Sequence, residues 1–150
     1  MAATHFSGPI VAGDLQTGET NGPNQGNVVL SQFTSITQNS TNAVSSTLYI
    51  PAGSQILSFN VDVLTAFDSA TSATLTIGTA AAGTQYVGSV NAKTAGRASI
   101  TYSAAQLAAM SGVTVTGTAS PTTAPVVVTV TPSGATTAGY VEVTVLYVQQ

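Results

Sequence analysis

The stretch ILSFNVDVL, residues 56–64, has the clearest strand pattern in the first half of the chain. Its apolar and polar side chains alternate. One predicted face holds Leu57, Phe59, Val61 and Val63, and the other holds Ser58, Asn60 and Asp62. Successive side chains of a strand point to opposite faces of its sheet, so this alternation predicts a strand with one buried face and one polar face. Such strands are typical of antiparallel sheets that cover a core on one side.

Strand-like stretches occur along the rest of the chain. The most regular is YVEVTVLYV at 140–148, with Val141, Val143, Val145 and Tyr147 on one side. Shorter stretches rich in β-branched and aromatic residues lie at 28–36, 45–50, 73–78, 85–90, 97–102, 113–118 and 125–132. Turn signals separate them, such as PAGS at 51–54, where Gly53 is free to take a positive φ, and SPTTAP at 120–125.

One stretch has a helical pattern instead. AAQLAAM follows Ser103 and consists of good helix formers. It predicts a short helix over 104–110, with Leu107 and Met110 facing the core. Ser103 or Thr101 is the expected N-cap, and Gly112 the expected end.

Eight or nine short strands spaced about 8–12 residues apart, with many turn residues, predict an all-β sandwich or barrel. We expect a jelly-roll-like β-sandwich with one short helix, since eight strands in two packed sheets suit the length of 150 residues. An immunoglobulin-like sandwich is the alternative. Residues 1–27 are rich in Gly, Asn, Thr and Pro without an apolar period, and predict an extended N-terminal arm or loop before a single domain at 28–150.

The composition excludes several classes of function. Charged residues make up 5% of the chain, against an average of about 25%. Two cations, Lys93 and Arg97, are too few for the basic surface that binds nucleic acid or an acidic membrane. There is no cysteine and no apolar run long enough to span a membrane. With so little charge repulsion between copies, we expect the chain to associate into a homo-oligomer or a larger assembly.

Groups suited to catalysis are scarce, and we expect no catalytic residue, cofactor or metal. The one histidine, His5, lies in the arm, and neither a catalytic triad nor a metal-ligand spacing is present. Asp62 and Glu142 are the only acids within predicted strands, and a two-acid glycosidase would need them to face each other. Exposure of both to solvent is the simpler interpretation. Asp68, in the turn-like stretch AFDSATS, is expected to bond backbone N–H groups of the turn.

An apolar patch lies near the start of the arm. It consists of Phe6, Pro9, Ile10 and Val11, with His5 beside it. Apolar residues within a loop-like arm predict an interface with a neighbouring subunit. The alternative is that the arm folds back on its own domain.

Several stretches together resemble small structural proteins of tailed bacteriophages, and more narrowly head decoration (cement) proteins. They are THFSGPIVAG at 4–13, PAGSQILSFNVDVLTAFDS at 51–69, TLTIGT at 74–79 and TTAGYVEVTVLYV at 136–148. The resemblance implies a dimeric or trimeric β-sandwich or jelly-roll subunit, made in the host cytoplasm. It would sit on the capsid exterior and clamp neighbouring major capsid proteins.

A tail or fibre-associated receptor-binding module is the alternative function. Such a module would expose aromatic side chains in a groove lined by loops. The candidates are Tyr49, Tyr86, Tyr102 and Tyr140.

Overall fold

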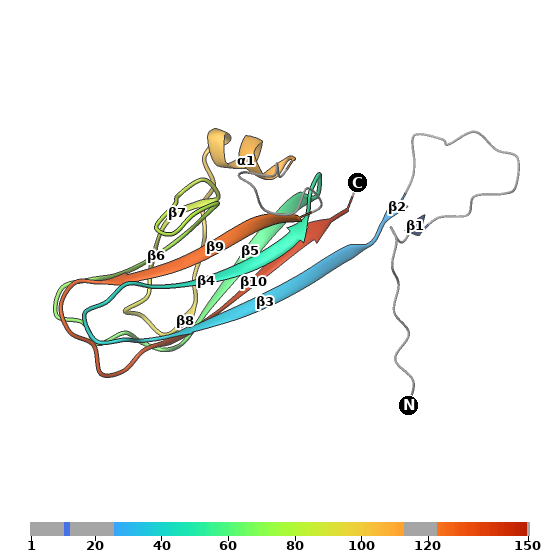
Figure 1. Ribbon diagram of the computed structural model, residues 1–150. Coiled ribbons are helices and arrows are strands. Elements are labelled where there is room, and N and C mark those ends of the chain that lie inside the picture. Colours follow the sequence, from blue (N-terminus) through green and yellow to red (C-terminus); the bar gives the residue numbers. More distant parts are fainter. Residues whose placement is uncertain (1–10, 13–25, 113–122, 150) are drawn as a thin grey trace, which may run out of the picture.

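The computed structural model of the chain describes residues 11–12, 26–112 and 123–149, and shows two four-stranded antiparallel sheets packed face to face (Figure 1). The first sheet has the order β3 (Val29–Thr37), β10 (Tyr140–Val148), β5 (Gln55–Thr65) and β8 (Gly96–Arg97). The second has the order β4 (Val44–Pro51), β9 (Thr123–Pro132), β6 (Ala73–Gly78) and β7 (Val87–Asn91). Two further two-residue strands, β1 (Val11–Ala12) and β2 (Gly26–Asn27), pair with each other.

The order of the strands is that of a jelly roll. The chain passes from one sheet to the other between β3 and β4, again between β4 and β5, and again between β5 and β6. Among the described strands of the two four-stranded sheets, only β6 and β7 are neighbours both in the chain and in a sheet. The predicted jelly-roll-like sandwich is therefore confirmed. The immunoglobulin-like alternative is wrong, because its first two strands share a sheet whereas β3 and β4 do not.

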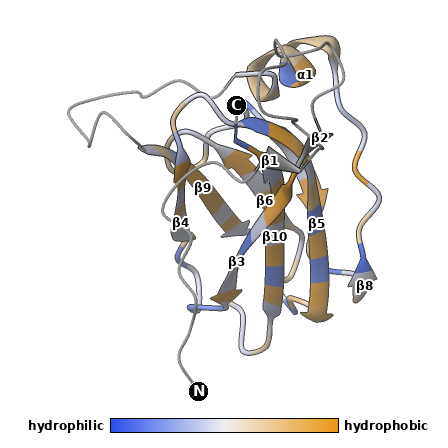
Figure 2. Cartoon of the chain, turned by 90° about the vertical axis from the view of Figure 1, so that its right-hand side faces the viewer, coloured by the Kyte–Doolittle hydropathy of each residue, from blue (hydrophilic) through white to orange (hydrophobic). Residues whose placement is uncertain are grey.

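The core lies between the sheets and is built from alternate residues of the central strands. Along β10, every second side chain from Val141 to Tyr147 is buried, as the sequence predicts. Figure 2 shows the same alternation of apolar and polar residues along β5 and β10. On β6, Leu75 and Ile77 are fully buried, which confirms the predicted face of that strand.

The prediction for Leu57 is wrong because β5 contains two irregularities. Its pairing with β10 shifts between Ser58, opposite Leu146, and Ile56, opposite Tyr147, so Leu57 is an extra residue. A residue inserted in this way reverses the alternation on one side of it. Ile56 is therefore buried, whereas Leu57 is 43% exposed. A second shift makes Leu64 an extra residue, and its side chain is also exposed.

The predicted helix is confirmed as α1 (Ala104–Met110), but only one of its predicted core residues is buried. Ser103 is the N-cap, and its side chain and that of Gln106 each accept a hydrogen bond from the other residue's backbone amide. Met110 is buried, whereas Leu107 is 52% exposed, so its placement in the core was wrong. Only the last turn, at Ala109 and Met110, packs on the core, and Leu107 lies one turn earlier. The helix closes with Ser111 as C-cap, directly before Gly112.

The strand predicted at 97–102 is mostly absent. Of this stretch only Arg97 lies in β8, and the Ala98 amide makes a last ladder-like bond to the Val61 carbonyl at 2.9 Å. Two residues before Val61 on β5, the Phe59 amide donates to the hydroxyl oxygen of Tyr102 at 3.0 Å instead of to a backbone carbonyl. The side chain thus takes the place of the next strand residue and ends the ladder.

The remaining predictions differ from the structure mainly at strand ends. The strands predicted at 28–36, 45–50, 85–90 and 125–132 correspond to β3, β4, β7 and β9, with boundaries shifted by one or two residues. The turn at 51–54 is confirmed, with Gly53 at φ +82° and the Ser54 amide bonded to the Pro51 carbonyl at 3.2 Å. Thr123 and Ala124, predicted to lie in a turn, belong to β9. The strand predicted at 113–118 lies outside the described residues.

Candidate functional site

The predicted interface in the arm lies almost entirely outside the described residues. His5, Phe6, Pro9 and Ile10 are not described, and of Val11 only the backbone is, opposite Asn27 in the β1–β2 pair. The arm interface therefore stays a prediction.

Asp62 and Glu142 are brought directly opposite each other, on neighbouring strands of the first sheet. Asp62 is engaged by Arg97, whose Nε donates to Oδ1 at 2.7 Å and whose second guanidinium nitrogen donates to Oδ2 at 2.9 Å. Glu142 accepts a hydrogen bond from the Tyr140 hydroxyl at 2.9 Å. Both carboxylates therefore have protein partners on the outer face of the sheet.

This arrangement meets only one requirement of a two-acid enzyme. The carboxylates are close, but the hydrogen bond from Arg97 holds the pKa of Asp62 below its ordinary value. A general acid needs a carboxyl group that keeps its proton near neutral pH, which calls for a raised pKa. Asp62 is thus a poor proton donor, and the pair is best described as part of a polar cluster with Arg97 and Tyr140.

Asp68 joins two loops at the end of the sandwich opposite α1. Its Oδ1 accepts bonds from the amides of Thr137 at 2.8 Å and Ala138 at 3.1 Å, and its Oδ2 accepts the Thr137 hydroxyl at 2.6 Å. These bonds, the hydroxyl of Thr137 first, lower the pKa of Asp68 to about 2. The predicted structural role is confirmed, but the partners lie in the loop before β10 instead of in the local turn.

Both cations of the chain are also held by the protein itself. Lys93 donates from Nζ to the carbonyl oxygens of Ser69, at 2.5 Å, and Ala70, at 3.3 Å. Arg97 is paired with Asp62 and lines a shallow hollow of about 250 Å³ formed by residues 89–91 and 94–99. Both cations therefore already have partners within the chain, and neither is left unpaired to attract an acidic ligand.

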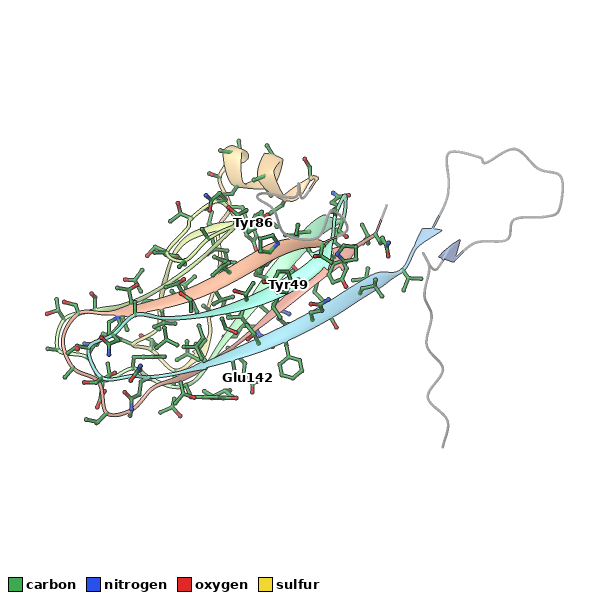
Figure 3. The ribbon with its side chains drawn as sticks, in the orientation of Figure 1. Tyr49, Tyr86 and Glu142 are labelled. Atoms are coloured by element: carbon green, nitrogen blue, oxygen red, sulfur yellow. The ribbon has the colours of Figure 1, made fainter. Side chains whose placement is uncertain are left out.

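The four tyrosines proposed for a receptor groove do not form a set of exposed rings. Tyr86 is buried against Phe59, Tyr102 bonds the Phe59 amide, and Tyr140 bonds Glu142. Only Tyr49, on β4, is well exposed, at 54%. Figure 3 shows Tyr49 and Tyr86 in different parts of the sandwich, with Glu142 on the other sheet.

The most unusual surface of the described chain is the side of the sandwich where β3 and β4 run. Each is the outermost strand of its sheet, and no described strand pairs with its outer edge. They are nine and eight residues long, and neither contains a charged residue. Natural proteins usually protect such edges with charges, prolines, bulges or short strands. Here the only such feature is Pro51, at the end of β4.

Side chains on this open side are unusually apolar or only weakly polar. Phe33 on β3 is 70% exposed, and Val29 and Tyr49 are also exposed. Between the two edges, Leu30, Val44 and Leu48 are only half-buried against the core. The hydroxyls of Thr34 and Ser46 form a 2.6 Å hydrogen bond that links β3 to β4.

The backbone groups of β3 that no described strand pairs with belong to its odd-numbered residues. Beyond the pair Thr37–Tyr140, the Gln38 amide donates to the Gly139 carbonyl at 3.0 Å. Hydrogen-bonded and non-bonded pairs alternate along an antiparallel ladder, so the even-numbered residues of β3 bond β10. The N–H and C=O groups that point away from β10 therefore belong to Val29, Ser31, Phe33, Ser35 and Thr37.

This edge was not predicted from the sequence. The two faces of 29–37 carry similar mixtures of apolar and hydroxyl side chains, so their alternation did not show which side Phe33 would take. The absence of charge from both this stretch and 44–51 was the available signal.

Comparisons with known proteins add no assignment: no family model, no curated protein and no solved structure matches this chain. In the part of the chain that the structure describes, no helix is long and apolar enough to cross a membrane. Within the same residues, no three His, Asp or Glu side chains gather in a group that could hold a metal ion. The open side is therefore the feature of the described chain that bears most directly on function.

Proposed function

We propose that this protein is a structural component of a virus particle, which binds the outside of a bacteriophage capsid and stabilises contacts between major capsid proteins. The observation that carries the proposal is the pair of long, uncharged and uncovered strands β3 and β4. Such strands bind a neighbouring protein through backbone hydrogen bonds and apolar contacts. A protein that holds adjacent capsid proteins together needs this kind of contact.

Two further observations support this proposal. The stretches at 4–13, 51–69, 74–79 and 136–148 resemble those of head decoration proteins. The strand order is that of a jelly roll, a fold found in viral capsid proteins and also in lectins and cupins. Fold alone does not fix function, so the strand order adds weight only together with the uncharged edges.

The proposed mechanism is a shift of an equilibrium by binding. A protein that binds the intact shell more tightly than a disrupted one stabilises the intact shell by that difference in affinity. Where an oligomer contacts several capsid proteins at once, its individual weak contacts reinforce one another. The N-terminal arm, with His5, Phe6, Pro9, Ile10 and Val11, is proposed to add a strand to a neighbouring subunit.

The test uses capsids of the phage that encodes the chain, prepared from a strain that lacks this gene. Purified protein is added back, and the particles are imaged by electron cryomicroscopy and heated to find the temperature at which the shells rupture. We expect ordered density on the outer surface of the head and a higher rupture temperature. Protein found only on the tail or fibres would support the receptor-binding alternative and overturn the proposal, as would failure to bind the particle.

The arm is tested by deleting residues 1–12. We expect lower occupancy of the capsid at the same protein concentration, because the contact with the neighbour is lost. A matched control is Ala105→Lys, which changes an exposed residue of α1, an element outside the arm and outside β3 and β4. Equal occupancy for the deletion variant, the control and the unaltered protein would show that the arm is not an interface.

A further inference from the structure

The free edge of β3 is arranged symmetrically about Phe33. This residue is the fifth of the nine in the strand, and it is the most exposed large apolar side chain of the described residues. The residues whose backbone groups are free lie evenly on both sides of it: Ser31 and Ser35 two positions away, Val29 and Thr37 four positions away. An antiparallel copy of the same edge, centred on Phe33, would therefore place every free N–H opposite a free C=O.

We propose that β3 pairs with β3 of a second copy of this chain, across a twofold axis at Phe33. The first sheets of the two copies would then join into one continuous eight-stranded sheet. Phe33 would lie opposite the partner's Phe33, and Ser31 opposite the partner's Ser35. The inference rests on the proposed function, because it names the partner of β3, one of the two open edges on which that function depends. The other edge, β4, and the N-terminal arm then remain available to contact the capsid.

The pairing satisfies the groups that the single chain leaves open. Each of the five odd-numbered residues of β3 would donate one backbone hydrogen bond and accept one. Phe33, 70% exposed in the single chain, would cover the same side chain of the other copy as an aromatic cross-strand pair. On the inner side, the half-buried Leu30 would meet the partner's Ile36, which extends the core across the junction.

Charge also permits a second copy at this position. No residue of β3 is charged, so two identical edges meet without repulsion. The nearest acid along the row of Ser35 is Glu142 on β10, which is bonded to Tyr140. A twofold interface must be complementary to itself, and an uncharged edge with paired Ser and a central Phe meets that condition.

The chain's own N-terminal segment fits the same edge less well. The β1–β2 pair sets Val11 opposite Asn27, and no described residue of this segment pairs with the outer edge of residues 29–37. Continuing that register along β3 would set Pro9 opposite Val29. The free Val29 carbonyl needs an N–H donor there, and proline has none.

The absence of cysteine in the chain gives a direct test. Phe33→Cys places one thiol of each copy on the proposed axis, where the Cα atoms of a hydrogen-bonded pair are about 5.5 Å apart, within the range for a disulfide. Thr37→Cys is the matched control on the same strand, because residue 37 would face the partner's Val29. We expect mild oxidation, or a short bifunctional thiol reagent, to link Phe33→Cys covalently into dimers and to leave the two chains of Thr37→Cys unlinked, as denaturing electrophoresis would show. Equal linking of the two variants, or none in either, would overturn the inference.

A second test uses charge in place of a covalent link. Ser31 and Ser35 are exposed, so substitutions there leave the fold intact, which circular dichroism checks. In the double variant S31K/S35K every new lysine faces a lysine of the other copy, whereas in S31E/S35K every lysine faces a glutamate, and both variants keep the same lysine opposite Glu142. We expect the dissociation constant of the dimer to rise about tenfold to thirtyfold in S31K/S35K and to stay close to that of the unaltered protein in S31E/S35K.

Sedimentation of the purified protein provides the readout. We expect about 30 kDa for the unaltered protein and for S31E/S35K, twice the mass of the 14.9 kDa chain. A monomeric unaltered protein, or the same dissociation constant for both charged variants, would overturn the inference. These measurements use no capsids. Capsid binding by protein that does not dimerise would leave the proposed function standing, and dimers that do not bind capsids would overturn only the proposed function.

Discussion

Replacing Gly139 by alanine tests the packing at the end of the sandwich where Asp68 joins two loops. A Cβ atom at this position would lie 2.5 Å from Cδ1 and 2.6 Å from Cγ of Phe67. The φ angle of Gly139 is +151°, which residues with a side chain rarely adopt. The Phe67 ring has no room to retreat, because it is only 2% exposed and its backbone amide is bonded to the Ala92 carbonyl at 3.0 Å.

The expected loss of stability has two parts. A strained backbone conformation costs about 1–3 kcal/mol, and an overpacked core contact costs about 1–3 kcal/mol. We therefore expect the free energy of unfolding to fall by about 2–6 kcal/mol. For a domain of this size each kcal/mol lowers the melting temperature by about 2–4 °C, so the melting temperature should fall by about 4–24 °C.

Urea unfolding followed by circular dichroism measures this loss. The matched control is Gly112→Ala, since no atom lies within 4 Å of the added Cβ there. Gly53→Ala isolates the backbone part, because φ is +82° and the space around it is empty. Phe67→Ala combined with Gly139→Ala should cost about 1–3 kcal/mol less than the sum of the two single variants, since the clash is removed. A loss for Gly139→Ala within about 0.5 kcal/mol of that for Gly112→Ala would refute the reasoning.

Three further predictions concern pH, the helix and salt. The pKa of Asp68 is lowered from 3.8 to about 2 in the fold, so its carboxylate stabilises the fold fully above pH 3.8 and loses this effect as the pH falls to about 2. Asp68→Asn should flatten this part of the pH dependence of urea unfolding, and an unchanged slope would contradict it. Met110→Ala should cost about 2–5 kcal/mol and Leu107→Ala less than about 0.5 kcal/mol, and similar losses by thermal unfolding would show that α1 packs differently. The bound fraction in capsid-binding assays should change little as sodium chloride is raised, whereas a steep decrease would reveal an ionic interface.

The strands with a regular period were predictable from the sequence because one rule governs them. In β10 every second side chain enters the core, and neither proline nor glycine interrupts the strand, so its boundaries and its buried face both follow from the pattern. The capping of α1 was predictable for a similar reason, because Ser103 and Gln106 satisfy the helix end within four residues.

Other features depend on contacts between distant parts of the chain. The extra residue at Leu57 appears only when β5 is aligned with β10, so the local alternation pointed to the wrong face. The partners of Asp68 lie about seventy residues further along the chain, at 137 and 138. That Phe33 lies at the centre of an uncovered edge follows from the order of the strands, which no local pattern contains.

The placement of the two basic side chains affects how the protein is detected. Trypsin cleaves after Lys and Arg, and here it has only two target residues, Lys93 and Arg97. Both are engaged in the folded chain, one by backbone carbonyls and the other by a carboxylate. Even after denaturation, digestion releases one four-residue peptide between two fragments too long for routine mass spectrometry. A tryptic inventory of a sample therefore overlooks this protein easily, and a protease that cleaves after aromatic residues is the better reagent.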